Sequence, residues 1–243
     1  MSLLDRISKD RIEGKVKLLL YGLSGAGKTT MIKTFPNLNK TLVIDIEKGL
    51  KSLGNLKVDS ILINSLAEFN DLCKELKTDT IQNRYETIVI DSLTELQQYM
   101  INTICEEKKT NILTIGDWGI IANKCSRMIR WLRDLDYNIF VIAGAEENSK
   151  EEITYIRPLL SGKISRNIGA QFDEMWYLQV QTIEKEKEDK IETIRMLITD
   201  TFKGNGKEIL AKSRSNISQF IYGDNCNISN LLFKKKETER GKI

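Results

Sequence analysis

The chain has 243 residues, of which 41% are hydrophobic and 29% charged, a composition typical of a folded domain with a buried core. No apolar run reaches the roughly 18 to 20 residues needed to cross a bilayer, and residues 1–14 lack the apolar core of a signal peptide, so we expect a cytoplasmic protein without a membrane partner. The sequence contains no histidine, and its four cysteines form no C-x-x-C pair, which excludes zinc sites and histidine-based triads.

A glycine-rich loop follows the first predicted strand, residues 16–21, and precedes a predicted helix over residues 29–35. Its sequence, Gly-Leu-Ser-Gly-Ala-Gly-Lys-Thr, is a complete G-x-x-x-x-G-K-[ST] phosphate loop in the strand and helix context that such a loop requires. Glycine lets several backbone N–H groups converge on one phosphate, and the positive end of the helix adds to them. The predicted nucleotide-binding residues are Gly22, Ser24, Gly25, Ala26, Gly27, Lys28, Thr29 and Thr30.

Two side chains of this loop have separate predicted tasks. We expect Lys28 to reach the β and γ phosphates of a bound nucleoside triphosphate, and the Thr29 hydroxyl to bind Mg²⁺. The remaining Mg²⁺ positions would be filled by phosphate oxygens, water and one acidic contact elsewhere in the chain. The loop therefore predicts a site for a triphosphate and its divalent cation.

The chain continues with strands that alternate with helices. Strands are predicted at residues 41–46, 60–64 and 87–91, and helices at residues 66–77 and 93–104. Strands that are followed by helices indicate a parallel sheet, because each connection has to return to the same end of the sheet.

The second half of the chain is predicted to contain an amphipathic helix, one more parallel strand, a polar segment, a β-hairpin with a charged turn, and a last short strand. In that order, these are residues 117–135, 138–143, 146–168, 174–199 with the turn at 184–190, and 208–212. We therefore predict an α/β fold with a mostly parallel sheet flanked by helices and a C-terminal antiparallel hairpin. Residues 203–243 carry a basic excess of five charges, for which a solvated tail is the simplest interpretation.

Asp91 is the predicted acidic partner of Thr29. It ends the apolar strand 87–91, the Walker B arrangement, in which a carboxylate at the C-terminal edge of a parallel strand faces the metal of the nucleotide. The alternative is that Asp91 only caps the following helix. Ser92 and Glu95 also form a capping-box pattern, so that a structural role competes with a catalytic one for Glu95.

A second acidic pair, Asp45 and Glu47, lies at the end of the preceding strand. Alternation along a strand places the two side chains on the same face. Hydrolysis of a phosphoanhydride needs an in-line water, a metal and fixed positive charge rather than a covalent nucleophile. We predict that Glu47 positions the water, with Glu95 as the other candidate and with a surface role for Glu47 as the alternative.

Residues 42–50 and 89–96 resemble the RecA-type ATPase core, in which the glutamate after the second strand activates water and the later Asp-Ser pair is Walker B. The chain also resembles the RecA-like phage nucleotide-binding proteins, the Sak-four group of single-strand annealing and recombination ATPases within the AAA-type P-loop family. Three further segments support this resemblance: Asp117-Trp118-Gly119, Leu160-Ser161-Gly162-Lys163 before Asp173, and Ala211-Lys212-Ser213-Arg214. The resemblance implies an N-terminal arm at residues 1–14, a RecA-like core at residues 15–215 and a basic tail at residues 216–243.

The resemblance implies ATP and Mg²⁺ as ligands, ATP hydrolysis, and single-stranded DNA as a partner in recombination or annealing. It also implies self-association into a ring or filament, a single-strand binding protein as a further partner, and the host cytoplasm if the protein is phage-encoded. Lys212 and Arg214 would act across a subunit boundary on the γ-phosphate held by a neighbour, where an inserted arginine adds about 10³ to 10⁵ in rate.

DNA contacts in such cores come from loops after the later strands, here residues 108–117 and 146–168. Their candidate residues are Lys108, Lys109, Lys150, Arg157, Lys163 and Arg166, with Tyr155 for base stacking. The acidic residues in the first half of the second segment favour a contact that depends on oligomer geometry, and an ordinary surface loop is the alternative.

Two other functions use the same phosphate loop. A small-molecule or nucleoside kinase should carry an arginine-rich lid, which the sequence lacks. A non-enzymatic, nucleotide-dependent switch for a replication partner need not hydrolyse quickly, so the effect of removing the Glu47 charge on turnover separates a switch from an ATPase.

Overall fold

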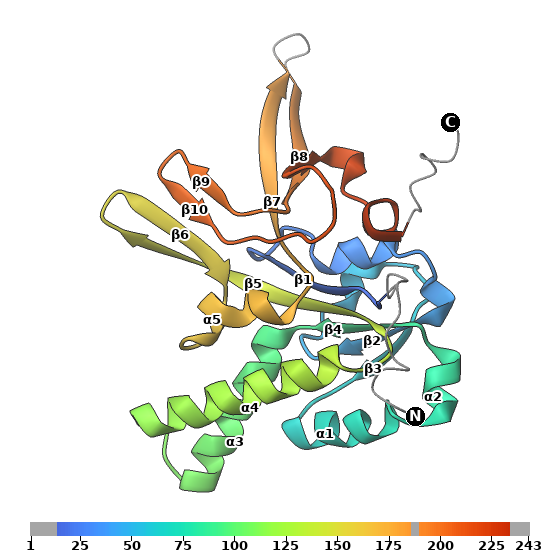
Figure 1. Ribbon diagram of the computed structural model, residues 1–243, viewed down its shortest axis with the longest axis vertical. Coiled ribbons are helices and arrows are strands. Elements are labelled where there is room, and N and C mark those ends of the chain that lie inside the picture. The colour runs from blue at the N-terminus through green and yellow to red at the C-terminus, as the bar shows by residue number, and fades with distance from the viewer. Residues whose placement is uncertain (1–13, 186–189, 234–243) are drawn as a thin grey trace, which may run out of the picture.

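The computed structural model describes residues 14–185 and 190–233, and Figure 1 shows their arrangement around a central sheet. The strand order is β11-β8-β7-β1-β5-β4-β2-β3. Neighbours from β7 to β3 run parallel, whereas β8 is antiparallel to both β7 and β11. The strands are β1 (Lys17–Gly22), β2 (Thr41–Asp45), β3 (Asp59–Leu62), β4 (Thr87–Asp91), β5 (Asn138–Lys150), β7 (Glu174–Lys185), β8 (Lys190–Ile198) and β11 (Phe220–Tyr222).

Helices cover both faces of this sheet, as predicted (Figure 1). Helices α1, α3 and α4 pack on one face, and the 3₁₀-helices η2 and η4 pack on the other. None of the described helices combines the length and apolarity needed to cross a membrane. The α-helices are α1 (Leu66–Glu75), α2 (Asp79–Arg84), α3 (Leu93–Lys108), α4 (Ile115–Arg133) and α5 (Ile164–Asn167); the other helices are η2 (Thr29–Thr34), η3 (Leu38–Lys40), η4 (Leu50–Leu53), η5 (Ile168–Gln171), η6 (Gly223–Asn225) and η7 (Ser229–Phe233).

Strand alternation divides the core between the two faces. In β1, Leu18 and Leu20 belong to the cluster with η2 and η4, whereas Leu19 and Tyr21 belong to the cluster with α1, α3 and α4. All four side chains are buried, which is expected for a parallel strand covered on both faces. The same alternation decides which residues at the strand ends face η2.

A small side sheet extends the main sheet, and it shows that the prediction for residues 146–168 was wrong. The segment 146–168, predicted as a polar connection, contains the end of β5, all of β6 (Ile153–Pro158) and α5. β6 pairs with β5 and with β10 (Lys207–Ile209), which in turn pairs with β9 (Phe202–Gly204). The end of β5 is exposed, so it needs no apolar alternation, and periodicity therefore did not reveal it.

The helix predicted over residues 29–35 also differs from the prediction in its type and in its end. η2 is a 3₁₀-helix of six residues rather than an α-helix. It ends at Thr34, and the next residue, Phe35, is extended with ψ of 149°. Pro36 follows, and the residue before a proline is disfavoured in the helical region.

The predicted arm, the charged turn and the tail lie partly outside the residues that the structure describes. The predicted arm is described only at residue 14, and most of the charged turn, residues 186–189, lies outside the described part. The predicted tail begins at residue 216, but β11 within it pairs with β8 and Ile221 is buried. Within residues 216–233, β11 therefore adds a strand to the main sheet, and residues 234–243 lie outside the described part.

Candidate functional site

The phosphate loop connects β1 to η2 at the C-terminal edge of the sheet. Gly25 and Gly27 have φ values of +78° and +90°, a region that favours glycine, and they turn the loop back on itself. A Cβ atom at Gly22 would lie 2.4 Å from the Leu178 carbonyl oxygen of β7. The loop therefore needs glycine at Gly22 for close packing and at Gly25 and Gly27 for backbone conformation, as phosphate-binding nests do.

Lys28 lies across this loop. Its Nζ donates a hydrogen bond of 2.9 Å to the Leu23 carbonyl oxygen, so the ammonium group is held over the turn. Burial lowers the pKa of Lys28, and the negative charges of Glu47 and Asp91 oppose that change. The ammonium group is thus close to both carboxylates that the sequence assigned to the site.

Thr29 and Asp91 are joined directly. The Thr29 hydroxyl donates a hydrogen bond of 2.6 Å to Asp91 Oδ2, at the end of β4. Asp91 is 1% exposed, and its Cα pairs with that of Asp45 in β2. Burial raises the pKa of Asp91 to about 6; Glu47 and Asp45 add to that rise, while the bond from Thr29 and the charge of Lys28 reduce it.

The second carboxylate oxygen of Asp91 is the clearest indication that this site suits a metal ion. Asp91 Oδ1 is buried and has no hydrogen-bond partner among the described residues. A buried oxygen beside a threonine hydroxyl fits Mg²⁺, which prefers oxygen ligands and takes few of them from the protein. Within residues 14–185 and 190–233, no group of three or more acidic or cysteine side chains could hold a metal alone. Thr29 and Asp91 would therefore hold Mg²⁺ together with phosphate oxygens.

Glu47 reaches the site by a different route from the one predicted. β2 ends at Asp45, so Glu47 does not share a strand face with it. Instead the N–H groups of Ile46 and Glu47 both donate to the Asp91 carbonyl oxygen, at 2.7 and 3.1 Å, and the chain turns at Lys48 with φ of 59°. This wraps the loop over the end of β4 and leaves the Glu47 side chain exposed beside Lys28.

The other candidate carboxylate, Glu95, lies in the first turn of α3. Its backbone N–H donates to the Ser92 hydroxyl at 3.3 Å, which gives α3 its N-cap. After burial, the charge of Glu95 is the largest cause that raises the pKa of Tyr99. The capping role inferred from the sequence is therefore present for Ser92, and the Glu95 side chain lies near Tyr99.

The structure does not bring Lys212 and Arg214 to the phosphate loop of their own chain. Lys212 Nζ donates to the carbonyl oxygens of Gly169 and Phe172, at 3.0 and 2.7 Å. Arg214 pairs with Asp173 at 2.6 Å, and the Asp173 N–H bonds to the first residue of β1. This ion pair is therefore at the opposite edge of the sheet from Gly22, about 16 Å away along β1.

Residues of the predicted DNA-binding segment 108–117 end α3 and start α4. Lys108 forms an ion pair with Asp117, and Lys109 ends α3 in the left-handed region with φ of 52°. Asp117 completes a capping box with Thr114, which starts α4 at Ile115, two residues earlier than predicted. The hydrogen bond from Lys108 lowers the pKa of Asp117 to about 2, followed in effect by the bonds from Thr114.

The second predicted DNA segment surrounds a hollow of about 590 Å³ between the β5–β6 hairpin and α5. The Arg157 guanidinium lies 5.2 Å from the centre of the Tyr155 ring and 3.8 Å from Glu208. The hollow is lined by Glu146, Asn148, Lys150, Tyr155, Arg157, Leu160, Ser161, Gly162, Ser165 and Arg166. Of the predicted basic residues, Lys163 is exposed nearby without lining it.

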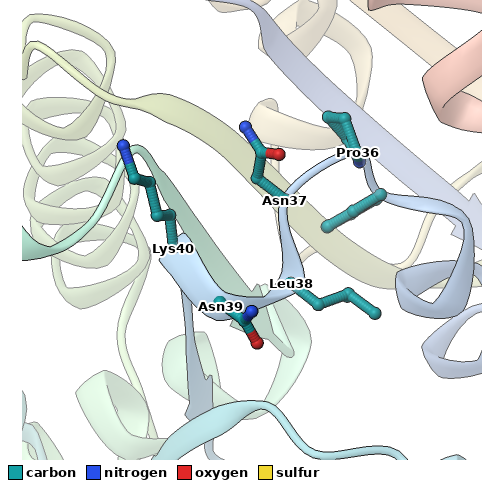
Figure 2. Close-up of a pocket in the computed structure, with 6 residues that line it drawn as sticks. Pro36, Asn37, Leu38, Asn39 and Lys40 are labelled. Carbon is teal, nitrogen blue, oxygen red and sulfur yellow. The ribbon is translucent and has the colours of Figure 1, made fainter.

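Another hollow, of about 600 Å³, is lined by residues 35–40 between η2 and β2. Figure 2 shows the side chains that line it. Two of the hollow's polar side chains are already paired: Lys40 and Asn37 both donate hydrogen bonds to the Glu86 carboxylate, at 2.6 and 3.0 Å. It lies before the start of β2, whereas the phosphate loop lies at the opposite ends of the strands. It therefore takes no part in the site.

Sequence reasoning missed Arg195, whose guanidinium lies against Gly27. A Cβ atom at Gly27 would be 2.7 Å from Arg195 Nε. β8 was predicted, but no sequence signal shows that its hairpin would pair with β1 beside the loop.

Replacing Asp91 with asparagine should separate stability from ligand binding. The Asp91→Asn substitution removes a buried charge and keeps an acceptor for Thr29, so we expect the metal-free protein to unfold at the same or a higher temperature. We expect the affinity for Mg²⁺ with nucleotide to fall about 10- to 100-fold, because a metal contact is lost. Thermal unfolding and calorimetric titration measure both, with Asp71→Asn on the exposed face of α1 as the control. A variant with normal Mg²⁺-dependent binding would contradict the metal assignment.

A family model described as an AAA domain matches residues 14–215, a span that begins three residues before β1 and includes Thr29, Asp91, Lys212 and Arg214. A comparison with curated proteins returned no match.

Proposed function

The chain belongs to the AAA-type family of P-loop ATPases, and from this premise we propose that it binds ATP with Mg²⁺ and hydrolyses it. The observation that carries the proposal is the 2.6 Å bond from Thr29 to Asp91, whose other carboxylate oxygen is buried without a partner beside a glycine-rich phosphate loop. A site prepared for a cation and a polyanion explains both the orphaned oxygen and the loop conformation.

Each part of the site has a role in this reaction. The backbone N–H groups of the loop and Lys28 bind the phosphates, and Thr29 and Asp91 hold the cation against them. Mg²⁺, when bound, neutralises charge on the phosphate oxygens. The bond of Lys28 to Leu23 is then exchanged for a stronger bond to a phosphate, because both partners are charged.

Glu47 is the proposed water-positioning residue. It is exposed, unlike Asp91, and it lies in a loop whose backbone is bonded to the Asp91 carbonyl oxygen. A Cβ atom at Gly49, two residues later, would lie 3.9 Å from the Thr29 hydroxyl, so this loop lies over the predicted metal position. A carboxylate at Glu47 can thus accept a hydrogen bond from a water that attacks the terminal phosphate.

Substituting Glu47 with glutamine should lower turnover and spare binding. We expect the rate of phosphate release by Glu47→Gln to fall about 10²- to 10⁴-fold, because general-base assistance is lost, with ATP affinity close to that of the wild type. Steady-state phosphate release and equilibrium titration measure the two quantities. Glu75→Gln, on the exposed surface of α1, is the matched control.

Two outcomes would change this assignment. Normal turnover in Glu47→Gln together with a loss in Glu95→Gln would move the role to Glu95. ATP binding without measurable turnover in the wild type would instead favour the nucleotide-dependent switch.

We further propose that the protein acts on single-stranded DNA in phage-type recombination or annealing. The support is the resemblance to single-strand annealing ATPases and the hollow on the β5–β6 hairpin, which Lys150, Arg157 and Arg166 line together with Tyr155. Proteins that bind single strands combine cations along the backbone with aromatic rings on which bases stack. Glu146 in the same hollow limits the affinity of one isolated copy, which favours binding by an assembly.

Substitutions in this hollow test the DNA proposal. Tyr155→Ala should weaken binding of single-stranded DNA by about 1–3 kcal/mol through lost stacking. Arg166→Ala should reduce the slope of log affinity against log salt concentration by about 1, because one phosphate contact is lost. Fluorescence anisotropy across a salt series, with ATP turnover recorded at each point, provides the measurement, and Arg127→Ala on α4 is the control. Equal affinity for both variants and the wild type would rule out this hollow.

The proposed assembly gives Lys212 and Arg214 a role on a neighbour's nucleotide. Both are paired within their own chain, so Arg214 would have to exchange Asp173 for a phosphate across the boundary. The exposed side chains of Ile112 and Ile115, 80% and 93% accessible, support self-association at the start of α4.

The assembly proposal predicts that turnover per chain rises with protein concentration. In Arg214→Ala this rise should be lost, because the cation that reaches the neighbour is missing. Turnover measured over a concentration series, alongside light scattering for the oligomeric state, decides the point. Wild-type turnover by assembled Arg214→Ala would show that Arg214 has no such role.

A further inference from the structure

The β7–β8 hairpin is anchored directly beside the phosphate loop. β7 pairs in parallel with β1 along residues 18–21, and the Leu178 carbonyl oxygen fills the space next to Gly22. β8 then pairs with β7, with Arg195 opposite Val180. Figure 1 shows this hairpin rising from the sheet next to β1. A residue of β8 near this point is therefore positioned by regular strand pairing.

Alternation along β8 directs Arg195 to the same face as the loop. Leu197, two residues later, belongs to the core cluster that contains η2, whereas Met196 and Ile198 belong to the cluster on the opposite face. The backbone here is also fixed from the C-terminal side, because the buried Cys226 thiol lies 3.6 Å from the Arg195 carbonyl oxygen. Arg195 thus stands on a rigid element.

The guanidinium of Arg195 lies against the last glycine before Lys28. A Cβ atom at Gly27 would be 2.7 Å from Nε, 3.0 Å from Nη2 and 3.2 Å from Cζ of Arg195. The absence of a side chain at Gly27 therefore serves two purposes: it permits the φ value of +90°, and it leaves room for the guanidinium. The Arg195 side chain is itself exposed, so its N–H groups can reach a ligand.

We propose that Arg195 binds the phosphate chain of the nucleotide from the β8 side, as a second cation supplied by the same chain as Lys28. The inference deepens the proposed ATPase function and rests on it. Lys28 offers a point charge, whereas a guanidinium presents a planar fork that can bond two phosphate oxygens at once. The family resemblance assigned positive charge at the phosphates to Lys212 and Arg214 of a neighbouring subunit. Arg195 would supply part of that charge within a single chain.

The test uses the full-length protein at a concentration at which it is monomeric. Arg195→Gln, which removes the charge and keeps a shorter polar side chain, should bind ATP and ADP about 10- to 100-fold more weakly than the wild type, because bonds to a charged group are lost. Arg195→Lys should recover part of the affinity by charge alone. Arg127→Gln, an exposed arginine on α4, should bind as the wild type does. Calorimetric titration measures the affinities, and thermal unfolding checks that each variant is folded.

A second measurement needs no substitution. In the wild type, ATP and ADP should protect Arg195 from an arginine-specific dicarbonyl reagent, as followed by peptide mass spectrometry, whereas adenosine should not. A purely structural contact with Gly27 would give no such dependence on phosphate.

The outcomes distinguish the role of Arg195 from the proposed ATPase function. If the wild type binds ATP, but Arg195→Gln binds it equally well and Arg195 is not protected, the inference on Arg195 is overturned and the ATPase proposal stands. If the wild type binds no nucleotide, the proposed function falls and the inference falls with it.

Discussion

The hydrogen bond from the Thr29 hydroxyl to the buried Asp91 carboxylate is the interaction on which the site depends. It joins the phosphate loop after β1 to the end of β4, two strands that are separated in the sheet by β5. Because all three strands are parallel, their C-terminal ends meet at one edge, and alternation turns Asp91 toward η2. The chemistry of the site is thus a consequence of strand direction and register.

The site carries an imbalance of charge that a cation and a polyanion would correct together. Burial raises the pKa of Asp91, and the negative charges of Glu47 and Asp45 raise it further. Lys28 is the cation close to Asp91 and Glu47. Arg195 adds positive charge next to Gly27. Carboxylates and cations gathered around one phosphate loop match a phosphate chain with a bound metal ion. Such an arrangement costs stability in the empty protein, as functional sites commonly do.

The parts of the site that the sequence predicted are those encoded locally. The phosphate loop has a fixed spacing, Asp91 ends an apolar strand, and the β7–β8 hairpin consists of two β-rich stretches on either side of a charged turn, so each was found from the local sequence. The end of β5 was missed because it is exposed and shows no apolar alternation, and the position of Arg195 beside Gly27 depends on a contact between distant segments. The approach of Glu47 through a turn at Lys48, rather than along β2, is of the same kind. The partners of Lys212 are carbonyl groups about 40 residues away in the chain, which no local pattern reveals.

The central claim is that this loop holds a nucleoside triphosphate with its divalent cation. Equilibrium calorimetry with ATP, in the presence of Mg²⁺ and then of a chelator, tests it most directly on the wild type and on Lys28→Ala. The account predicts saturable one-site binding that weakens when the metal is removed and is largely lost in Lys28→Ala. Absence of binding by the folded wild type to both ATP and GTP, with and without Mg²⁺, would contradict it.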